Sequence, residues 1–211
     1  MHLAVYPPDG RVHISVPMGF SIEKVRMYIL QKWIWIEEKR ISVLEYNRQA
    51  VRIFVSGEAH YFKGELYRLK IVNTKNEIQR AEIQGDYIVL FVRENANLSH
   101  KQSVLNEWYR DNLRSILEKF VDKWEKILHV KLTCWEIRLM SAHWGTCSKQ
   151  KKKAIFNLEL AKKPLAYIEY VVAHELTHLI ERTHSDRFKR ILDIYLPDWI
   201  EIKKKLNEFP V

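Results

Sequence analysis

The sequence predicts an α+β protein with a β-rich N-terminal half followed by a half dominated by helices. Before residue 94, short segments of alternating or β-branched residues are separated by turn residues. Residues 94–99 form a polar stretch that is typical of a linker. Beyond it, apolar residues recur at the helical period over a long segment. We therefore expect two domains, at residues 1–96 and 97–211, with one helix in the first.

The N-terminal half contains the segments that predict strands. One helix should interrupt them, because Ser21 is a suitable N-cap and apolar residues from Ile22 to Ile36 recur at helical spacing. Glycine, asparagine and aspartate punctuate the strand-like segments. The expected strands are Arg11 to Val16, Val51 to Val55, Leu66 to Val72, Ala81 to Ile83 and Tyr87 to Val92.

The C-terminal half should begin with a long helix. Ser99 and Gln102 fit a capping box, and the apolar stripe continues from Leu105 to Ile127. Two strands are expected next, at residues 131–140 and 154–160. Pro164 is well suited to open a helix that runs to about Glu181. Helices at about 185–195 and 199–206 complete the expected order.

Composition restricts the class of protein. The 211 residues are 47% hydrophobic and 29% charged, which excludes a disordered or collagen-like chain. Two cysteines cannot form a disulfide framework. The first residues lack the pattern of a signal peptide, and no apolar run approaches the roughly 20 residues of a membrane span. We therefore expect a cytoplasmic protein without a membrane partner; the sequence does not indicate its oligomeric state.

The net charge of +9 is concentrated in residues 101–211. Such a surface attracts polyanions at low salt, so nucleic acid is one candidate partner. Charge alone does not locate a nucleic-acid site, and a solvated surface explains the same excess. The sequence gives this partner weak support.

The chemistry concentrates in residues 172–178, Val-Ala-His-Glu-Leu-Thr-His, which contain an HExxH motif. Residues four apart share one face of a helix, so His174 and His178 can bind the same ion at the usual Zn–N distance of about 2 Å. Glu175 can then reach a metal-activated water without being a ligand, and act as general base. The rival explanation is a helix that carries these residues by chance. Its apolar flanks favour a half-buried metal site.

A third ligand requires the helix to end. His184 lies ten residues after His174, which is about 15 Å along an unbroken helix and too far to share an ion. A turn near residues 182–186 would bring His184 back toward the metal. Glu181 is the rival ligand, but it would stand in line with the two histidines along the helix. The spacing equals that of metzincins, although Glu181 replaces their glycine.

Four neighbouring features have simpler explanations as well as functional ones. Cys147 is a candidate fourth ligand or reactive thiol, but free cysteine is usually a small buried residue. Gly145 is expected to allow a tight turn. Residues 149–153 are rich in lysine and typical of a solvated hairpin tip. His143 is a candidate for stabilising an oxyanion.

Several segments together resemble the YgjP-like metallopeptidase family, most strongly between residues 103 and 199. They are Asp9-Gly10-Arg11-Val12, Val16-Pro17, Ser56-Gly57-Glu58, Gly64-Glu65-Leu66-Tyr67, His143-Trp144-Gly145-Thr146-Cys147-Ser148, Asn157-Leu158-Glu159-Leu160, residues 170–178, His184-Ser185-Asp186-Arg187-Phe188 and Pro197-Asp198-Trp199. The resemblance implies a zinc-dependent hydrolase akin to SprT-type and minigluzincin proteases. It implies one zinc ion per chain on His174, His178 and His184, with Glu175 as the catalytic base. It also implies a zincin-like half in which the HExxH helix packs on a small sheet.

The sequence therefore favours a zinc metallopeptidase that hydrolyses peptide bonds of a protein or peptide substrate. The alternative is a zinc-containing binding module that acts on or near nucleic acid without proteolysis. A further hypothesis concerns the strand at 154–160, which directly precedes the HExxH helix. A sheet edge at this strand would hold an extended peptide by strand addition.

Overall fold

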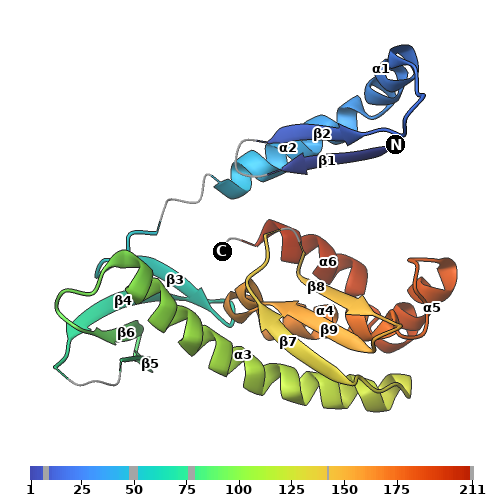
Figure 1. Ribbon diagram of the computed structural model, residues 1–211. Coiled ribbons are helices and arrows are strands. Elements are labelled where there is room, and N and C mark those ends of the chain that lie inside the picture. Colours follow the sequence, from blue (N-terminus) through green and yellow to red (C-terminus); the bar gives the residue numbers. More distant parts are fainter. Residues whose placement is uncertain (7–9, 48–51, 76–78, 142, 210–211) are drawn as a thin grey trace. The chain divides into compact units, whose positions relative to one another are not determined.

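The chain forms a mixed α+β structure, as the sequence predicts (Figure 1). The computed structural model describes residues 1–6, 10–47, 52–75, 79–141 and 143–209. The chain divides into two compact units, Met1–Arg52 and Ile53–Val211. Among the described residues, no helix has the length and apolar character needed to cross a membrane.

The first unit is a hairpin followed by two helices. Strands β1 (His2–Tyr6) and β2 (Arg11–Ser15) pair in antiparallel register, and α2 (Trp33–Asn47) packs on β1 and buries Ile36. Ser21 caps α1 (Ile22–Gln31) as predicted, because its hydroxyl oxygen accepts a hydrogen bond from the Lys24 amide at 3.4 Å. The single expected helix is interrupted at Lys32. The backbone angles of Lys32, with φ of −102° and ψ of 6°, depart from those of an α-helix, so α1 ends there before α2 begins.

The second unit begins with a four-stranded sheet. Its order is β3-β4-β6-β5, with β3 (Ala59–Phe62), β4 (Glu65–Asn73), β5 (Arg80–Gln84) and β6 (Tyr87–Val92). β4 and β6 are parallel and the other pairs are antiparallel. The last three strands match the predicted segments; β3 was not predicted.

The strand expected at 51–55 does not form in residues 52–55. The amides of Ile53 and Phe54 donate to the Glu58 carboxylate at 3.1 and 2.7 Å rather than to a neighbouring strand. Phe54 also has a φ of 51°, which reverses the chain locally. Val51 lies outside the described residues.

The helix α3 (Leu98–Leu128) connects this sheet to the rest of the unit. It begins before the predicted capping box, because the Asn97 side chain accepts the amide of His100 at 2.8 Å and caps the helix. Ser99 therefore lies inside the helix, and the Ser99–Gln102 box is wrong. The predicted apolar stripe is confirmed as one face of α3, which is buried from Leu105 to Leu128.

The units differ from the domain boundary expected near residue 96. One continuous core contains Phe62, Leu69 and Leu90 of the first sheet together with Leu105 and Tyr109 of α3. The Tyr109 hydroxyl also donates to the Tyr61 carbonyl at 2.8 Å. Residues 53–96 therefore group with 97–211, because the first turns of α3 pack on the sheet that precedes them.

A three-stranded sheet and four shorter helical segments follow α3. The sheet order is β7-β9-β8, with β7 (Cys134–Arg138), β8 (Gly145–Ser148) and β9 (Lys153–Asn157). β9 is parallel to β7 and antiparallel to β8. Both expected strands are present, although each is shorter than predicted. The helical segments are η1 (Leu158–Lys162), α4 (Leu165–Thr177), α5 (Asp186–Tyr195) and α6 (Trp199–Glu208).

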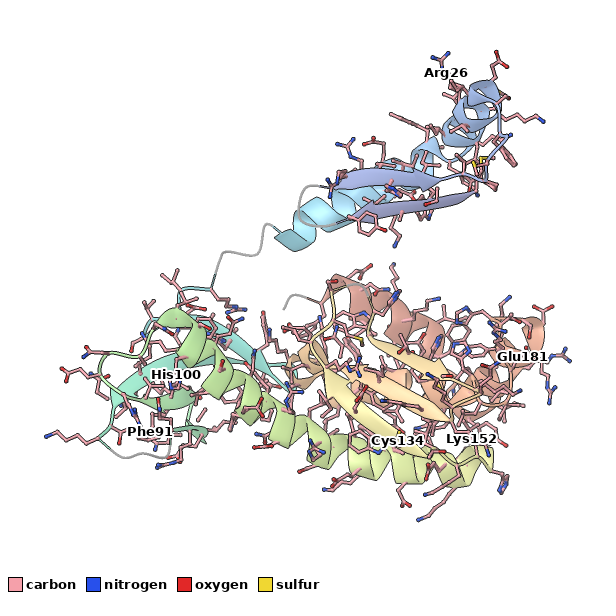
Figure 2. All side chains as sticks on the ribbon, in the orientation of Figure 1. Arg26, Phe91, His100, Cys134, Lys152 and Glu181 are labelled. Carbon is pink, nitrogen blue, oxygen red and sulfur yellow. The ribbon has the colours of Figure 1, made fainter. Side chains whose placement is uncertain are left out.

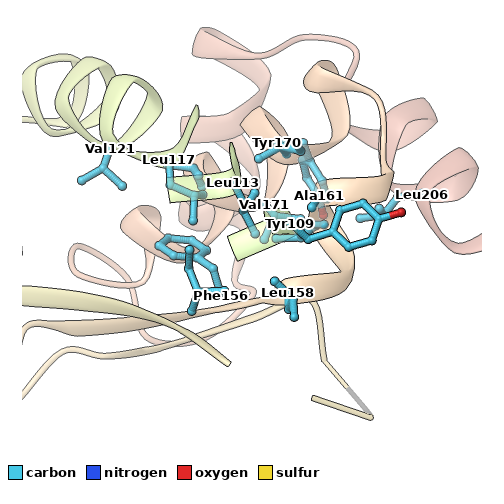
Figure 3. Close-up of a cluster of buried hydrophobic side chains, with 14 of the residues drawn as sticks. Tyr109, Leu113, Leu117, Val121, Phe156, Leu158, Ala161, Tyr170, Val171 and Leu206 are labelled. Carbon is cyan, nitrogen blue, oxygen red and sulfur yellow. The ribbon is translucent and has the colours of Figure 1, made fainter. Parts of the chain in front are cut away.

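The core of this region lies around α4. Figure 3 shows Leu113 and Leu117 of α3 gathered with Phe156 of β9 and Val171 of α4. Leu206 of α6 belongs to the same buried cluster. The helix α4 is thus enclosed by α3, the small sheet and α6, which fixes its position before any polar group is considered.

Candidate metal centre

The two histidines of the HExxH motif lie one turn apart on α4, as predicted. His174 and His178 have ring centroids 4.9 Å apart, and both are partly buried. Around them, Val171, Val172 and Leu176 are buried in the core. Core packing on one side of α4 therefore holds the two imidazoles toward the opposite side.

The helix ends earlier than the sequence predicts. It was expected to reach about Glu181, but α4 ends at Thr177 and His178 is its C-cap. The amides of Leu179 and Ile180 donate three residues back, to Leu176 and Thr177, at 3.0 and 2.9 Å. These tighter bonds turn the chain. A new helix, α5, starts at Asp186 with Ser185 as its N-cap, as predicted.

This turn, residues 178–184, brings the third histidine back. The Nε2 atoms of His184 and His174 are 3.0 Å apart, and one donor atom from each of the three histidines lies within 4.8 Å of the others. Figure 2 labels Glu181, which lies in the turn between α4 and α5. The Glu181 carboxylate is not part of this group and instead accepts from the Thr183 hydroxyl at 3.3 Å.

The three imidazoles suit a divalent metal such as zinc. Ligand atoms at about 2 Å from a tetrahedral ion are about 3.3 Å apart, close to the 3.0 Å between His174 and His184. Burial, together with His178, His184 and Lys203 nearby, lowers the pKa of His174 to about 3. Burial, together with His178 and Lys203 nearby, also lowers the pKa of His184. Both rings are therefore neutral near pH 7, the form that coordinates metals.

Groups behind the imidazoles hold them in orientation. Nδ1 of His178 lies 3.1 Å from the Glu181 carbonyl, which only accepts, so Nδ1 carries the proton and leaves Nε2 with its lone pair. The Tyr170 hydroxyl lies 3.4 Å from Nδ1 of His174. Phe188 of α5 contacts all three rings, with centroids 4.8 to 5.0 Å away. Sequence reasoning missed Tyr170 and Phe188 in these positions.

Glu175 is buried on α4, with 6% of its surface exposed. Burial raises the pKa of its carboxyl to about 8. Within the described residues the carboxylate has no hydrogen-bond or ion-pair partner, yet it lines both cavities beside the histidines. It is therefore a carboxyl group that can exchange a proton with a molecule in the cleft.

The strand β8 forms the wall opposite Glu175. A Cβ atom on Gly145 would come within 2.7 Å of Glu175 Cγ and 2.8 Å of Oε1. We expected Gly145 to permit a tight turn; it instead lies in a strand and permits close contact with Glu175. Asn157 of β9 braces the preceding loop by donating to the carbonyls of Met140 and His143 at 2.8 and 2.9 Å.

Two cavities lie at this centre. The larger has a volume of about 750 Å³ and is lined by residues 143 and 145–150, by the three histidines, and by Glu175 and Arg182. The smaller, of about 270 Å³, extends toward α6. His143 lines both. The expected peptide-binding edge at 154–160 is wrong, because β9 is the central strand with neighbours on both sides; the edge strand beside the cleft is β8.

Cys147 and the lysine-rich segment occupy supporting positions. Burial, with Glu175 nearby, raises the pKa of the Cys147 thiol to about 12, so it stays protonated. Cys147 is not among the three donors that converge. Lys149, after β8, donates to the Ile180 carbonyl at 2.8 Å and so ties the sheet to the turn 178–184. Lys151 and Lys152 are exposed, as expected of a hairpin tip.

Comparisons with known proteins give two matches. A family model described as "YgjP-like, metallopeptidase domain" matches residues 1–209. The chain is also similar to the metallopeptidase zymogen of Pyrococcus abyssi abylysin, with 21% identity and a TM-score of 0.40, over 43% of this chain and 90% of that one. No curated protein matches the sequence.

Proposed function

The chain belongs to the YgjP-like metallopeptidase family, and we propose that it is a zinc-dependent peptidase whose ion is held by His174, His178 and His184. The observation that carries the proposal is the convergence of three imidazole donors within 4.8 Å beside a buried carboxylate. Three neutral nitrogen ligands leave a fourth position open, as catalytic zinc sites require. A zincin-like arrangement of α4 on the small sheet follows from the same proposal.

Glu175 is the general base in this proposal. Zinc, when bound, supplies Lewis-acid polarisation and lowers the pKa of water. The Glu175 carboxylate takes a proton from the attacking water and returns it to the nitrogen of the leaving amine. Its place inside the cleft, with no competing partner among the described residues, supports this role. Gly145 keeps β8 close enough to limit the movement of Glu175.

The substrate in this proposal is an extended peptide. β8 is an edge strand of its sheet and lines the larger cavity along its whole length. An extended peptide can add to such an edge through main-chain hydrogen bonds. The side chain of His143 lies at the end of this wall and lines both cavities, so we propose that it contacts the carbonyl of the bond that is cleaved.

The experiment combines metal analysis with turnover. Purified protein should contain about one zinc per chain, and His184→Ala should lose most of it. His13→Ala, which removes an exposed histidine of the first unit, should retain the metal. Glu175→Gln should keep zinc while peptide cleavage falls by roughly 100- to 10,000-fold.

Other results would decide against this assignment. Zinc retained in His184→Ala would remove that residue from the ligand set. Cleavage that survives in Glu175→Gln would exclude Glu175 as the base. If the parent binds zinc and cleaves no peptide, but binds RNA or DNA in a salt-dependent manner, the alternative of a nucleic-acid binding module would replace the peptidase.

A further inference from the structure

The charged side chains around the cleft are almost all of one sign. Lys149 and Arg182 line the larger cavity, and Lys203 lines the smaller one. The one acidic residue among the lining residues of the two cavities is Glu175, which is buried. A cleft with this distribution of charge attracts negatively charged groups.

The smaller cavity lies directly beside the proposed catalytic groups. It is lined by His174, Glu175 and His184 on one side and by residues of α6 on the other. Its volume of about 270 Å³ is at the low end for a ligand site, so it suits one small group rather than a whole ligand. The remaining wall is partly apolar and contains Trp144, Val171 and Leu206.

Lys203 is the lysine among the residues that line this cavity. Among the described residues it pairs with no carboxylate, whereas Lys205 on the same helix binds Glu201 at 2.6 Å. The nearest aromatic ring, that of Trp199, has its centroid 6.0 Å from the Lys203 ammonium. Lys203 lies beside the metal centre, because the cavity that it lines is also lined by His174 and His184.

The cavity wall around Lys203 is held in place by hydrogen bonds. Asn207 accepts from the Trp144 indole at 3.2 Å and donates to the Lys203 carbonyl at 3.1 Å. Its amide therefore links α6 to the residue before β8. Because both ends of this amide are engaged, Lys203 is the polar side chain that remains available to a ligand among the α6 residues that line this cavity.

We propose that this cavity is an anion subsite in which Lys203 binds a carboxylate that flanks the cleaved bond of the substrate. This proposal rests on the proposed peptidase function and names its substrate class, an acidic peptide. The carboxylate has two possible sources: an aspartate or glutamate side chain, or the C-terminal carboxylate of the peptide. The small volume beside Glu175 accommodates either.

Binding tests the subsite without requiring cleavage. Zinc-loaded Glu175→Gln protein is titrated into fluorescein-labelled, C-terminally amidated alanine hexapeptides that carry one Glu, Gln or Lys, and anisotropy is measured. The Glu peptide should bind roughly tenfold more tightly than the Gln peptide. Lys203→Glu should abolish this preference and favour the Lys peptide. Lys204→Glu makes the same change of charge outside both cavities and should leave the preference intact.

The C-terminal carboxylate is tested with the Gln peptide as a free acid. If the free acid binds more tightly than the amidated Gln peptide, and only when Lys203 is present, the subsite takes a chain terminus. If only the Glu peptide binds more tightly than the amidated Gln peptide, the subsite takes an acidic side chain. The same titrations on metal-free parent protein, which contains Glu175, show whether the Gln substitution affects the result.

The outcomes separate this subsite from the peptidase itself. Equal affinity for the amidated Glu, amidated Gln and free-acid Gln peptides, a preference that persists in Lys203→Glu, or no binding of any peptide would overturn the subsite. Cleavage without preference for acidic peptides would leave the peptidase standing and remove only the subsite. A Lys203-dependent preference for the Glu peptide in a protein that cleaves nothing would retain the subsite and remove the peptidase.

Discussion

Two segments supply the three histidines, and the structure holds them in different ways. His174 lies in α4 and His178 is its C-cap, and the other faces of this helix are buried against α3, the small sheet and α6. His184 belongs to the turn 178–184, where residues 182–184 are exposed. Apolar packing positions the helix and the start of the turn, where Leu179 and Ile180 pack against the core, whereas polar contacts hold the rest of the turn. Substitutions in the helix should therefore destabilise the whole fold, whereas substitutions in the turn should mainly weaken metal binding.

The largest effect is expected where the helix meets the core. Leu176 is fully buried between the two histidines of α4, so Leu176→Ala should lower the free energy of unfolding by about 2–5 kcal/mol. Leu165→Ala, in the first turn of the same helix, is the control, because Leu165 is 45% exposed. Urea denaturation of metal-free protein measures both. Equal losses would show that the burial of Leu176 does not determine its contribution to stability.

The pH dependence of stability reports on the same buried helix. The pKa of Glu175 is raised to about 8, so metal-free folded protein binds a proton that the unfolded chain releases above about 4.5. The contribution of Glu175 to the free energy of unfolding should fall with rising pH, by at most about 1.4 kcal/mol per pH unit. His174, with its pKa lowered to about 3, acts oppositely between about 3 and 6.5. The two should nearly cancel between about pH 4.5 and 6.5, leaving a fall of about 2 kcal/mol between pH 6.5 and 8.

Glu175→Gln isolates this contribution. The free energy of unfolding of the metal-free variant should rise with pH up to about pH 6.5, because of His174. It should then stay constant between pH 6.5 and pH 8. Melting temperatures of parent and variant across this range provide the measurement. A parallel decline in both proteins above pH 6.5 would assign the effect to a group other than Glu175.

Gly145→Ala tests how rigidly the helix holds Glu175. The new Cβ atom would lie 2.7 Å from Glu175 Cγ, and a helix enclosed by the core cannot move away. We expect a loss of about 1–3 kcal/mol in unfolding free energy, and lower activity through displaced Glu175. Thr146→Ala, at the next and exposed position of β8, should change stability by less than about 0.5 kcal/mol. Unchanged stability in Gly145→Ala would mean that the Glu175 side chain, or α4 with it, moves more easily than the burial of Glu175 indicates.

The smallest effect should come from the turn. Lys149→Met removes the hydrogen bond to the Ile180 carbonyl, which connects β8 to the turn 178–184. Stability of the metal-free protein should change by about 1 kcal/mol or less, because the contact is exposed. Zinc affinity, measured by competition with a chelating dye, should fall several-fold as His184 becomes less well placed. Lys151→Met, at the exposed hairpin tip, is the matched control. A loss of stability in Lys149→Met as large as the loss in zinc affinity would contradict the division between helix and turn.

The elements that the sequence predicts well are those set by neighbours along the chain. The segment Tyr87–Val92 is a strand with the expected bounds, and Ser185 caps α5, because both signals are local. His174 and His178 share a face of α4 through helical periodicity alone. The need for a turn before His184 also follows from the sequence, since helix geometry separates His174 and His184 by about 15 Å otherwise.

At other positions, competing local signals made the sequence-based prediction wrong. Asn97 and Ser99 are both suitable N-caps, and only the folded chain shows that Asn97 accepts the His100 amide. Residues 52–55 have a strand-like composition, but the amides of Ile53 and Phe54 donate to the Glu58 carboxylate instead of to a neighbouring strand. Tyr170 carries a usable signal, since it lies four residues before His174 on the same helix face. Lys203 carries none, because its position depends on how α6 packs.

What the sequence by itself determined is the helix with its HExxH residues, the order of most elements and the requirement for a break before His184. The tertiary structure decided where α4 ends, which strand is the edge beside the cleft, and that residues 53–96 pack with α3. It also decided that Gly145 lies against Glu175. The physical reason is range: periodicity and caps act over three or four residues, whereas edges, close contacts and helix ends depend on segments distant in the chain.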